Sequence, residues 1–350
     1  MQWSTKWFEG YRGSLREGVP LARYSNLRIG GPAALFLEPW SEEDAALAVR
    51  VCLEHDLPWE VLGAGSNVLI PDEGVQCVVF HVGHWNRVVR DGDRLIASAG
   101  RSLPSLLRQA RELGLGGLEF LAGIPAQVGG AVAMNAGTRE CETCDLVESV
   151  RIVDRYGELR EVGRDGMHPT YRDGGLGHCL VTTATFRLTP RPEAVIRETY
   201  ERLMKHRNQT QPVSERSVGC IFKNPEGDFA ARLIQEAGLK GERLGDLEVS
   251  TKHANYFVNH GEGTAAQLME LMRRVQARVH DRFGVRLQPG PAVQPRGGRP
   301  GGGGRAGHRA VLRPKSFAPA GFRDQSRRAR ASEKVMPRLL AAFSSTSHWV

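Results

Sequence analysis

The stretch GGLEFLAGIPAQVGGAVAMNAG, residues 116–137, does most to decide how this chain folds. Its six glycines cost backbone entropy, so such a density is favoured where the main chain must approach a ligand closely. N–H groups in glycine-rich turns can also hold phosphates. Two further glycine runs, NLRIGGPA (26–33) and VLGAGSNVLIPDEGV (61–75), precede it. Three such turns in the N-terminal half predict a cradle for one large cofactor.

Composition places the chain among cytosolic globular proteins. Its 350 residues are 41% hydrophobic and 25% charged, which is typical of a globular fold of two or three domains. No apolar run approaches ~20 residues, and the start MQWSTKWFEGYRG lacks the pattern of a secretory signal. Six cysteines in a chain of this length do not describe a disulfide framework. We therefore expect a cytoplasmic protein with free thiols and no membrane partner.

The net charge of +8 is unevenly distributed along the chain. Residues 291–350 carry twelve Lys/Arg and two Asp/Glu, whereas residues 1–290 carry 35 and 37, a net of −2. A basic nucleic-acid-binding body is therefore not indicated. The Gly/Pro/Arg-rich composition of residues 290–350 favours disorder or a frameshifted reading. A nucleic-acid or membrane tether is the remaining interpretation, but that segment lacks aromatic interleaving and helical periodicity.

Periodicity and capping residues predict three parts: residues 1–189, residues 190–289 and the tail 290–350. A serine N-cap and acidic first turn predict a helix over 41–57, and closing glycines predict one over 103–117. Strands are expected between 146 and 188. The second part should contain helices from about 195, from about 228 and over 264–284, with strands near 253–259 and 285–289.

Seven short sequence motifs together indicate a family resemblance that one glycine-rich turn alone would not support. In chain order they are NLRIGGPA, LGAGSNVLI, GLEFLAGIPAQVGGAVAMNAG, YRDG, GCIFKNP, AARLIQEAGLKG and KHANYFVN. Together they resemble the UDP-N-acetylenolpyruvoylglucosamine reductase (MurB) family of peptidoglycan synthesis, over about residues 20–289. The short spacing between Arg172 and Cys220 resembles the family's second type, which lacks a tyrosine loop.

The resemblance implies an α+β fold. Residues 1–189 would form a two-subdomain FAD-binding region of the vanillyl-alcohol-oxidase/PCMH type, and residues 190–289 a C-terminal α/β substrate domain. The implied reaction uses NADPH and FAD to reduce the enol ether of UDP-N-acetylglucosamine enolpyruvate to UDP-N-acetylmuramate. The protein would supply position, charge stabilisation and one proton. We expect a monomer without nucleic-acid partners.

Two residues match the family's catalytic positions. Cys220, in GCIFKNP, stands where most members place a serine proton donor, and a thiol of ordinary pKa near 8.5 is protonated at neutral pH. The alternative is a small buried hydrophobe. Arg172, in YRDG, matches the arginine that steadies the enolate, and a guanidinium can grip a carboxylate in two places. Its alternative is a surface arginine at a strand end.

Other family positions imply binding roles. The resemblance assigns substrate contacts to Tyr171, Lys223, Asn224, Asn135 and His253, although Asn135 could brace its turn and His253 could be structural. The FAD-binding residues expected from the glycine runs are Gly63, Gly65, Ser66, Asn67, Gly123, Ile124, Gly129, Gly130 and Ala133. No metal site is expected, because one CxxC pair, Cys141 and Cys144, does not make a zinc site. The two cysteines are then either a redox pair or two unrelated loop cysteines.

One position departs from the family. Members end this domain with LEPEV, whose glutamate is the third catalytic residue, but this chain reads LQPGPAV and places Gly290 there. No acidic residue follows until Asp324. The break coincides with the change in composition, so a frameshift, a genuine extension and a catalytically impaired flavin-binding protein all remain open. A different FAD oxidoreductase on the same scaffold is the other alternative, against which GCIFKNP argues.

Overall fold

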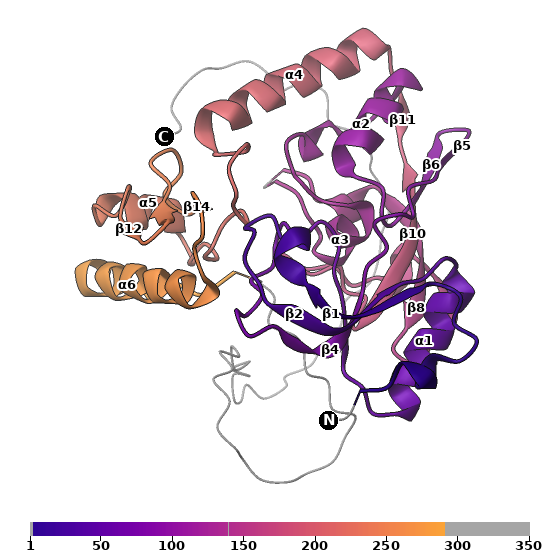
Figure 1. The fold of residues 1–350 in the computed structure, drawn as a ribbon. Helices are drawn as coiled ribbons and strands as arrows, with labels where there is room; N and C mark the ends of the chain where they lie inside the picture. The colour runs from indigo at the N-terminus through magenta and orange to yellow at the C-terminus, as the bar shows by residue number, and fades with distance from the viewer. Residues whose placement is uncertain (1–2, 139, 291–350) are drawn as a thin grey trace, which may run out of the picture. The chain divides into compact units, whose positions relative to one another are not determined.

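The computed structural model describes residues 3–138 and 140–290, all within one compact unit of the chain, Met1–Arg305 (Figure 1). A four-stranded sheet opens the fold in the order β1-β2-β4-β3. Strands β2 (Pro32–Glu38) and β3 (Trp59–Val61) run parallel to β4 (Val75–Phe80), and β1 (Ser14–Pro20) is antiparallel to β2. Parallel neighbours require a crossover, and helix α1 (Glu42–Glu54) lies on the path from β2 to β4, whereas residues 62–74 connect β3 to β4 without a helix.

The serine cap predicted for this helix is confirmed. Ser41 Oγ accepts a hydrogen bond from the N–H of Asp44 at 3.1 Å, and three acidic residues occupy the first turn. Both features stabilise the start of a helix, since they satisfy a free N–H group and oppose the helix dipole. The helix ends three residues before the predicted Leu57.

A five-stranded antiparallel sheet follows, in the order β5-β6-β10-β8-β9. Three of its strands, β8 (Val147–Asp154), β9 (Leu159–Gly163) and β10 (Cys179–Arg187), confirm the extended structure predicted between residues 146 and 188. The other two, β5 (Val88–Asp91) and β6 (Arg94–Ser98), come from earlier in the chain. Helix α3 (Val128–Ala133) packs against β10. Helix α2 (Leu103–Glu112) is shorter than predicted, because β7 (Leu115–Gly116) pairs with β11 (Thr189–Pro190).

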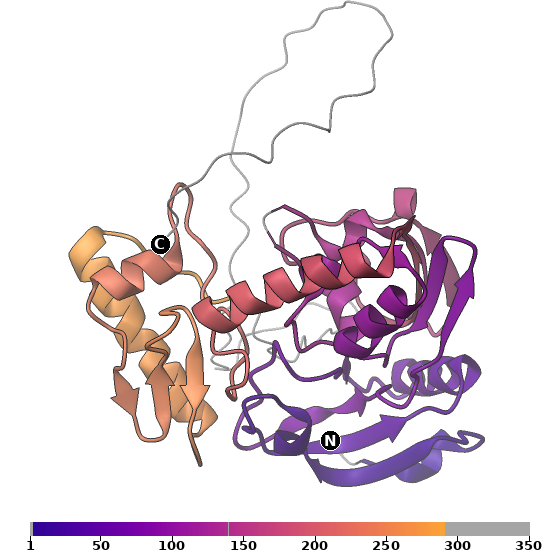
Figure 2. The ribbon, with the colours of Figure 1, turned by 90° about the horizontal axis from the view of Figure 1, so that it is seen from above.

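The last part of the unit begins with the long helix α4 (Glu193–Thr210), which contacts α2, β7 and the short helix η3 (Glu119–Leu121) (Figure 2). Three short strands, β12 (Arg243–Leu244), β13 (Leu247–Val249) and β14 (Phe257–Asn259), form an antiparallel sheet between α5 (Ala230–Glu236) and α6 (Ala265–Phe283) in the chain. The remaining short 3₁₀ helices are Thr5–Phe8, Leu21–Tyr24, Thr143–Asp145 and Arg164–Gly166.

Helix α6 follows its predicted pattern at both ends. Thr264 and Gln267 form a capping box, and Gly284 closes the helix with a φ of 69°. The predicted strand over 285–289 is wrong: among the described residues it is reduced to one bridge between Pro289 and Phe222. Gln276 Nε2 donates a hydrogen bond to the Leu287 carbonyl at 2.8 Å, so a helix side chain holds this segment.

The first glycine run joins the C-terminal elements to the N-terminal sheet. Asn26 Nδ2 donates to the Ser217 carbonyl at 2.6 Å, and Asn259 Nδ2 donates to the Leu27 carbonyl at 2.8 Å. Leu27 and Ile29 are themselves buried in the C-terminal core, with exposed fractions of 0% and 3%. The residues of this loop therefore serve packing between the parts of the fold, as well as any ligand.

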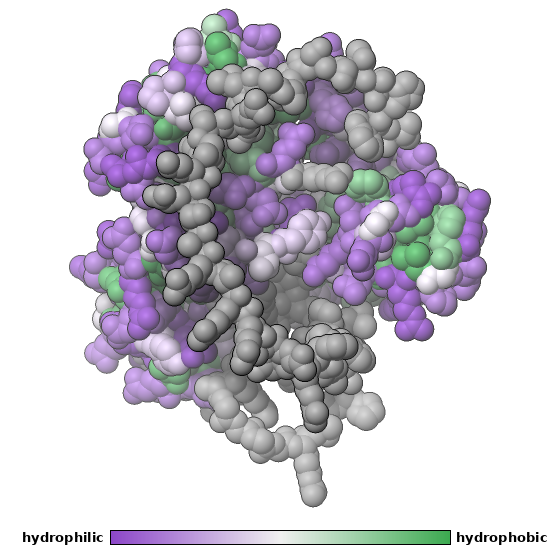
Figure 3. Space-filling view, turned by 180° about the vertical axis from the view of Figure 1, so that it is seen from behind, coloured by the Kyte–Doolittle hydropathy of each residue, from purple (hydrophilic) through white to green (hydrophobic). Residues whose placement is uncertain are grey.

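On the face seen in Figure 3, most coloured residues are hydrophilic and the hydrophobic ones form small groups. Large exposed hydrophobic side chains in the described ranges are scattered along the chain, as with Trp40 and Tyr156. Isolated residues of this kind are normal on a protein surface. None of the described helices combines the length and the hydropathy needed to cross a bilayer.

Candidate active site

A cavity of about 470 Å³ gathers most of the residues singled out from the sequence. This volume lies within the ~300–1,000 Å³ usual for small-molecule and cofactor sites. All nine predicted FAD residues line it: Gly63, Gly65, Ser66, Asn67, Gly123, Ile124, Gly129, Gly130 and Ala133. The predicted residues Tyr171, Arg172, Cys220 and Lys223 line it as well, together with Gly290.

The turn after β3 contains Gly63 and Gly65, and its geometry shows why glycine is needed there. Gly65 has a φ of +63°, and a Cβ there would lie 2.0 Å from the carbonyl oxygen of Tyr24. No other residue fits that position without moving the backbone. The N–H groups of Gly63, Gly65 and Ser66 make no hydrogen bond to another residue in the described ranges. This turn therefore has the properties of a backbone site for an anion such as a diphosphate.

The glycines of α3 act differently. The N–H groups of Val128 and Gly129 already donate to the carbonyls of Arg101 and Ala99, at 2.9 Å each. They hold the helix against its neighbours and are not available to a phosphate. Gly130, by contrast, faces open space, since a Cβ there would meet nothing within 4 Å. A flat cofactor ring could approach the backbone closely at that point. The cavity thus fits FAD through shape on this side and through N–H groups on the other.

Arg172 lies at the tip of a tight turn. Thr170 and Asp173 exchange both backbone hydrogen bonds, at 2.8 and 3.0 Å, which leaves Tyr171 and Arg172 between them. Arg172 adopts a φ of 64°, an arrangement that costs a non-glycine residue about 1–3 kcal/mol. Its guanidinium lies 5.5 Å from the ring centre of Tyr171. Backbone strain held in this way is often found where a side chain must be aimed at a ligand.

Cys220 is exposed to the cavity and is paired with Tyr256 through an isolated β-bridge. The surrounding protein desolvates the thiolate and so raises the pKa of this thiol, whereas the positive charges of Arg172 and Arg207 act in the opposite direction. Desolvation by the cavity walls is the largest of these effects, so the pKa of the thiol stays raised and the thiol is protonated at neutral pH. A protonated thiol beside two cations can give up its proton to a neighbouring atom and leave a thiolate that the cations stabilise.

The sequence did not single out Arg207 as a residue of the site. It lies near the end of α4, lines the cavity and donates from Nη2 to the Phe120 carbonyl at 3.2 Å. Desolvation lowers its pKa, with a further contribution from Arg172. Gln211 and Tyr256 also line the cavity and are joined by a 3.1 Å hydrogen bond from the tyrosine hydroxyl. The polar run MKHRNQTQ at the end of a predicted helix was the available signal for Arg207 and Gln211.

Three residues predicted to bind substrate are not among those that line the cavity. Asn224 Oδ1 accepts from the Ala230 N–H at 3.1 Å and so caps α5. Asn135 is buried and accepts from the Cys144 N–H at 3.0 Å, which braces its turn. His253 packs edge-on against Tyr256, with ring centres 4.8 Å apart, and burial lowers its pKa. Substrate contacts for these three stay predictions, and the contacts present here are structural.

Gly290 lies directly beside the proposed proton donor. Its N–H donates to the Ile221 carbonyl at 2.6 Å, and the Lys223 N–H donates to the Gln288 carbonyl at 2.8 Å. A Cβ at Gly290 would lie 3.1 Å from the Cys220 carbonyl oxygen. The residue at which the sequence departs from the family is therefore held at the cavity wall. Elsewhere in the chain, Cys141 and Cys144 do not belong to a group of metal ligands, because the described residues contain no such cluster.

Comparisons with known proteins agree with this geometry. A model described as "FAD binding domain" matches residues 33–163, and one described as "UDP-N-acetylenolpyruvoylglucosamine reductase, C-terminal domain" matches residues 211–294. The UDP-N-acetylenolpyruvoylglucosamine reductase of Moorella thermoacetica is 42% identical over 270 residues, covering 77% of this chain and 89% of that protein.

This chain belongs to the UDP-N-acetylenolpyruvoylglucosamine reductase family. The homologous reductase of Clostridium novyi is 36% identical over 78% of this chain and 90% of its own length. The crystal structure of MurB from Thermus caldophilus covers 79% of this chain and 97% of that protein, with 37% identity and a TM-score of 0.68. The predicted α+β fold, with an FAD-binding domain followed by a C-terminal domain of the reductase family, is confirmed. The assignment of the FAD-binding region to the vanillyl-alcohol-oxidase/PCMH type stays a prediction. The domain boundaries 1–189 and 190–289 remain predictions, and residues 291–350 lie outside the described residues.

Proposed function

We propose that this protein reduces UDP-N-acetylglucosamine enolpyruvate to UDP-N-acetylmuramate, with NADPH as the reductant and FAD as the bound cofactor. The observation that carries the proposal is the meeting of Arg172, Arg207 and Cys220 on the wall of one glycine-lined cavity. When bound, FAD supplies the hydride chemistry. The residues of the chain have to bind the substrate, hold its developing negative charge and deliver one proton.

The two arginines suit the enolpyruvyl carboxylate. Negative charge that spreads into that carboxylate during reduction would be stabilised by the nearby guanidinium groups, which cannot lose their charge at ordinary pH. Cys220 would then donate its thiol proton to the carbon next to the carboxylate. The resulting thiolate is stabilised by Arg172 and Arg207 and takes a proton back from solvent. Lys223, also at the cavity wall, offers a positive charge to the carboxylate or the diphosphate.

The experiment uses the full chain purified with its flavin. Bound FAD is measured by its absorption spectrum, and turnover by oxidation of NADPH upon addition of the enolpyruvyl substrate. We expect flavin binding, and substrate-dependent oxidation that Cys220→Ala lowers about 10²–10⁴-fold and Cys220→Ser largely retains. A purified chain that binds no flavin, or full activity in Cys220→Ala, would contradict the proposal.

A second candidate function is that of a flavin-binding protein with impaired catalysis. Gly290 favours it, since this position at the cavity wall carries no side chain. Bound flavin with negligible turnover would support this reading. In either case we propose a monomeric cytoplasmic protein without nucleic-acid partners. The near-neutral charge of residues 1–290 supports the last of these three points.

A further inference from the structure

The segment that carries Cys220 has few regular strand contacts. In the described part of the chain, Cys220 forms one isolated β-bridge, with Tyr256. Phe222 forms another, with Pro289 of a different segment. Cys220 and Phe222 line the cavity whereas Ile221 does not, which is the alternation of an extended strand. A slip of one residue would turn these side chains to the opposite face, so the position of the Cys220 thiol depends on what fixes the register.

Asn255 binds this segment through both backbone groups of Phe222. Its Oδ1 accepts from the Phe222 N–H and its Nδ2 donates to the Phe222 carbonyl, both at 2.9 Å. The main-chain carbonyl of Asn255 also accepts from the Ile221 N–H, at 2.8 Å. Asn255 is 1% exposed and is not among the residues that line the cavity. It therefore acts on the site only through the backbone that it holds.

The side-chain amide of Asn255 takes the place of a missing strand partner. An antiparallel pairing of Cys220 with Tyr256 would continue from Phe222 to Ala254. The chain forms a turn at Ala254 and Asn255 instead, so no regular ladder continues there. An asparagine amide offers the same donor and acceptor as a peptide group, and Asn255 extends the pairing by this means. Without it, two backbone groups of the buried Phe222 would lose these partners, which buried N–H and C=O groups rarely do.

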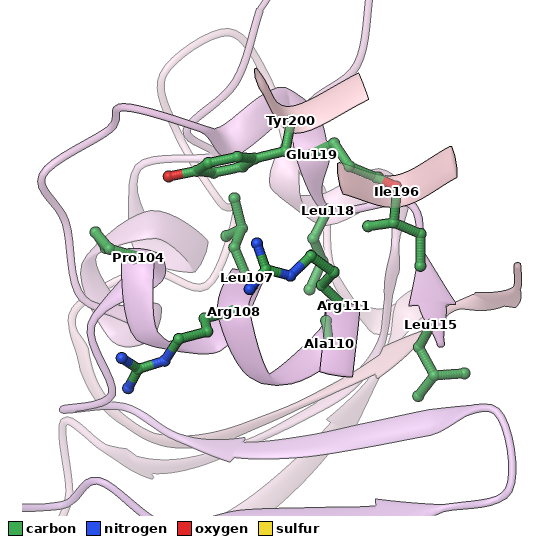
Figure 4. Close-up of a pocket in the computed structure, with 10 residues that line it drawn as sticks. All are labelled: Pro104, Leu107, Arg108, Ala110, Arg111, Leu115, Leu118, Glu119, Ile196 and Tyr200. Atoms are coloured by element: carbon green, nitrogen blue, oxygen red, sulfur yellow. The ribbon is translucent and has the colours of Figure 1, made fainter. Parts of the chain in front are cut away.

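The bridge partner of Cys220 is itself held in place. The Tyr256 hydroxyl donates to Gln211 Oε1 at 3.1 Å, and Gln211 is the C-cap residue of α4. Earlier in α4, Tyr200 lines a separate pocket of about 190 Å³, between α2, η3 and α4 (Figure 4). That pocket shares no lining residue with the cavity, so α4 meets the cavity only at its C-terminal end. Asn255 thus aligns its segment beside a neighbour that is already fixed.

We propose that Asn255 is a positioning residue for the reaction. It fixes the register of the segment that carries Cys220 and so keeps the thiol in the cavity with Arg172 and Arg207. Lys223, which also lines the cavity, follows on the same backbone. The effect of Asn255 on turnover rests on the function proposed above, whereas its effect on the backbone does not.

Hydrogen exchange of the FAD-loaded full chain tests the effect on the backbone. Asn255→Ala removes both side-chain hydrogen bonds to Phe222, and Asn255→Asp keeps the size of the side chain but loses the donor. We expect amide exchange in a peptide spanning 218–224 to become at least ~tenfold faster in Asn255→Ala, because the Phe222 N–H loses its acceptor. Asn259→Ala is the matched control, since the Asn259 side chain is equally buried but donates to the Leu27 carbonyl. Exchange at 218–224 should stay at the wild-type rate in this control.

Turnover shows whether this register matters for the reaction. In Asn255→Ala, kcat for substrate-dependent NADPH oxidation should fall ~10–100-fold at unchanged flavin content, since a displacement of about 1 Å can cost that much. Asn255→Asp should change in the same direction, and it decides the test if circular dichroism shows that Asn255→Ala is unfolded. In a folded variant, wild-type exchange at 218–224, or faster exchange with unchanged kcat, would overturn the proposal.

A wild type without turnover would contradict the proposed function but would still leave a readout for Asn255. Alkylation of Cys220 by iodoacetamide, followed by mass spectrometry, then replaces kcat. We expect its rate to change at least ~threefold in Asn255→Ala, because the thiol leaves its place beside the two arginines. The Asn259→Ala control should react like the wild type, and an unchanged rate in the folded Asn255 variants would overturn the proposal.

Discussion

Replacing Gly290 with glutamate tests whether the cavity lacks one charged group. The residue lines the cavity, and its hydrogen bond to the Ile221 carbonyl fixes its backbone beside Cys220. A Cβ there would lie 3.1 Å from the Cys220 carbonyl oxygen and 3.2 Å from the Ile221 carbonyl oxygen, so the neighbours must give by a few tenths of an ångström. The backbone does not require glycine, since its φ lies outside the left-handed region. We expect Gly290→Glu to fold with a free energy of unfolding within about 1 kcal/mol of the wild type.

The size of the effect on turnover follows from the role that the family assigns to this position. A positioned acid or base contributes about 10²–10⁴-fold to a proton-transfer step, so Gly290→Glu should raise kcat by a factor in that range. The assay is NADPH oxidation at saturating enolpyruvyl substrate, with flavin content measured on the same sample. Gly290→Gln is the matched control, because it has the same length and no carboxyl group. A folded, FAD-loaded Gly290→Glu no faster than the wild type, or a Gln variant equally fast, would refute the reasoning.

Three further predictions address the cofactor, the thiol and the fold. Gly130→Ala should leave stability unchanged or raise it by up to ~1 kcal/mol, because a Cβ there meets nothing, yet weaken FAD binding if the ring lies against this residue; thermal unfolding and flavin titration measure the two effects. Arg207→Gln should shift the pH midpoint of Cys220 alkylation upward, because loss of a cation destabilises the thiolate; a downward shift would contradict the assigned charge effect. Asp72→Ala should cost about 0.5–2 kcal/mol in urea unfolding, since Asp72 accepts from two N–H groups at the start of α6, and an unchanged midpoint would show that the cap contributes nothing.

The sequence predicted best those features that depend on local chemistry. Ser41, Thr264 and Gly284 are cap residues whose effect extends over one helical turn, and the helices begin or end beside them as expected. Gly65 in the 61–75 run has a positive φ, which is a local requirement for glycine, whereas the FAD contacts expected of this run stay predictions. Motif order was enough to identify the family, since each matching string carries such a local constraint.

The sequence could not supply the orientation of side chains. Asn135 and Asn224 belong to matching motifs, yet their amides hold neighbouring backbone groups, which depends on tertiary contacts. Arg207 lies on a helix with many charged neighbours, and only the packing of α4 against η3 directs it to the cavity.

The ties between distant segments set an order for folding during synthesis. Asn26 is bound to Ser217, Leu27 to Asn259 and Asp72 to Ala265, over separations of 191, 232 and 193 residues. At about 5–20 residues per second, Asp72 leaves the ribosomal peptidyl centre about 10–40 s before its partner is made. During this time the first glycine-rich turns lack the C-terminal residues that contact them. Long-range pairing of this kind also forms slowly. We expect the nascent chain to acquire its flavin only late in translation, so that an interrupted chain would carry an exposed, half-formed cradle.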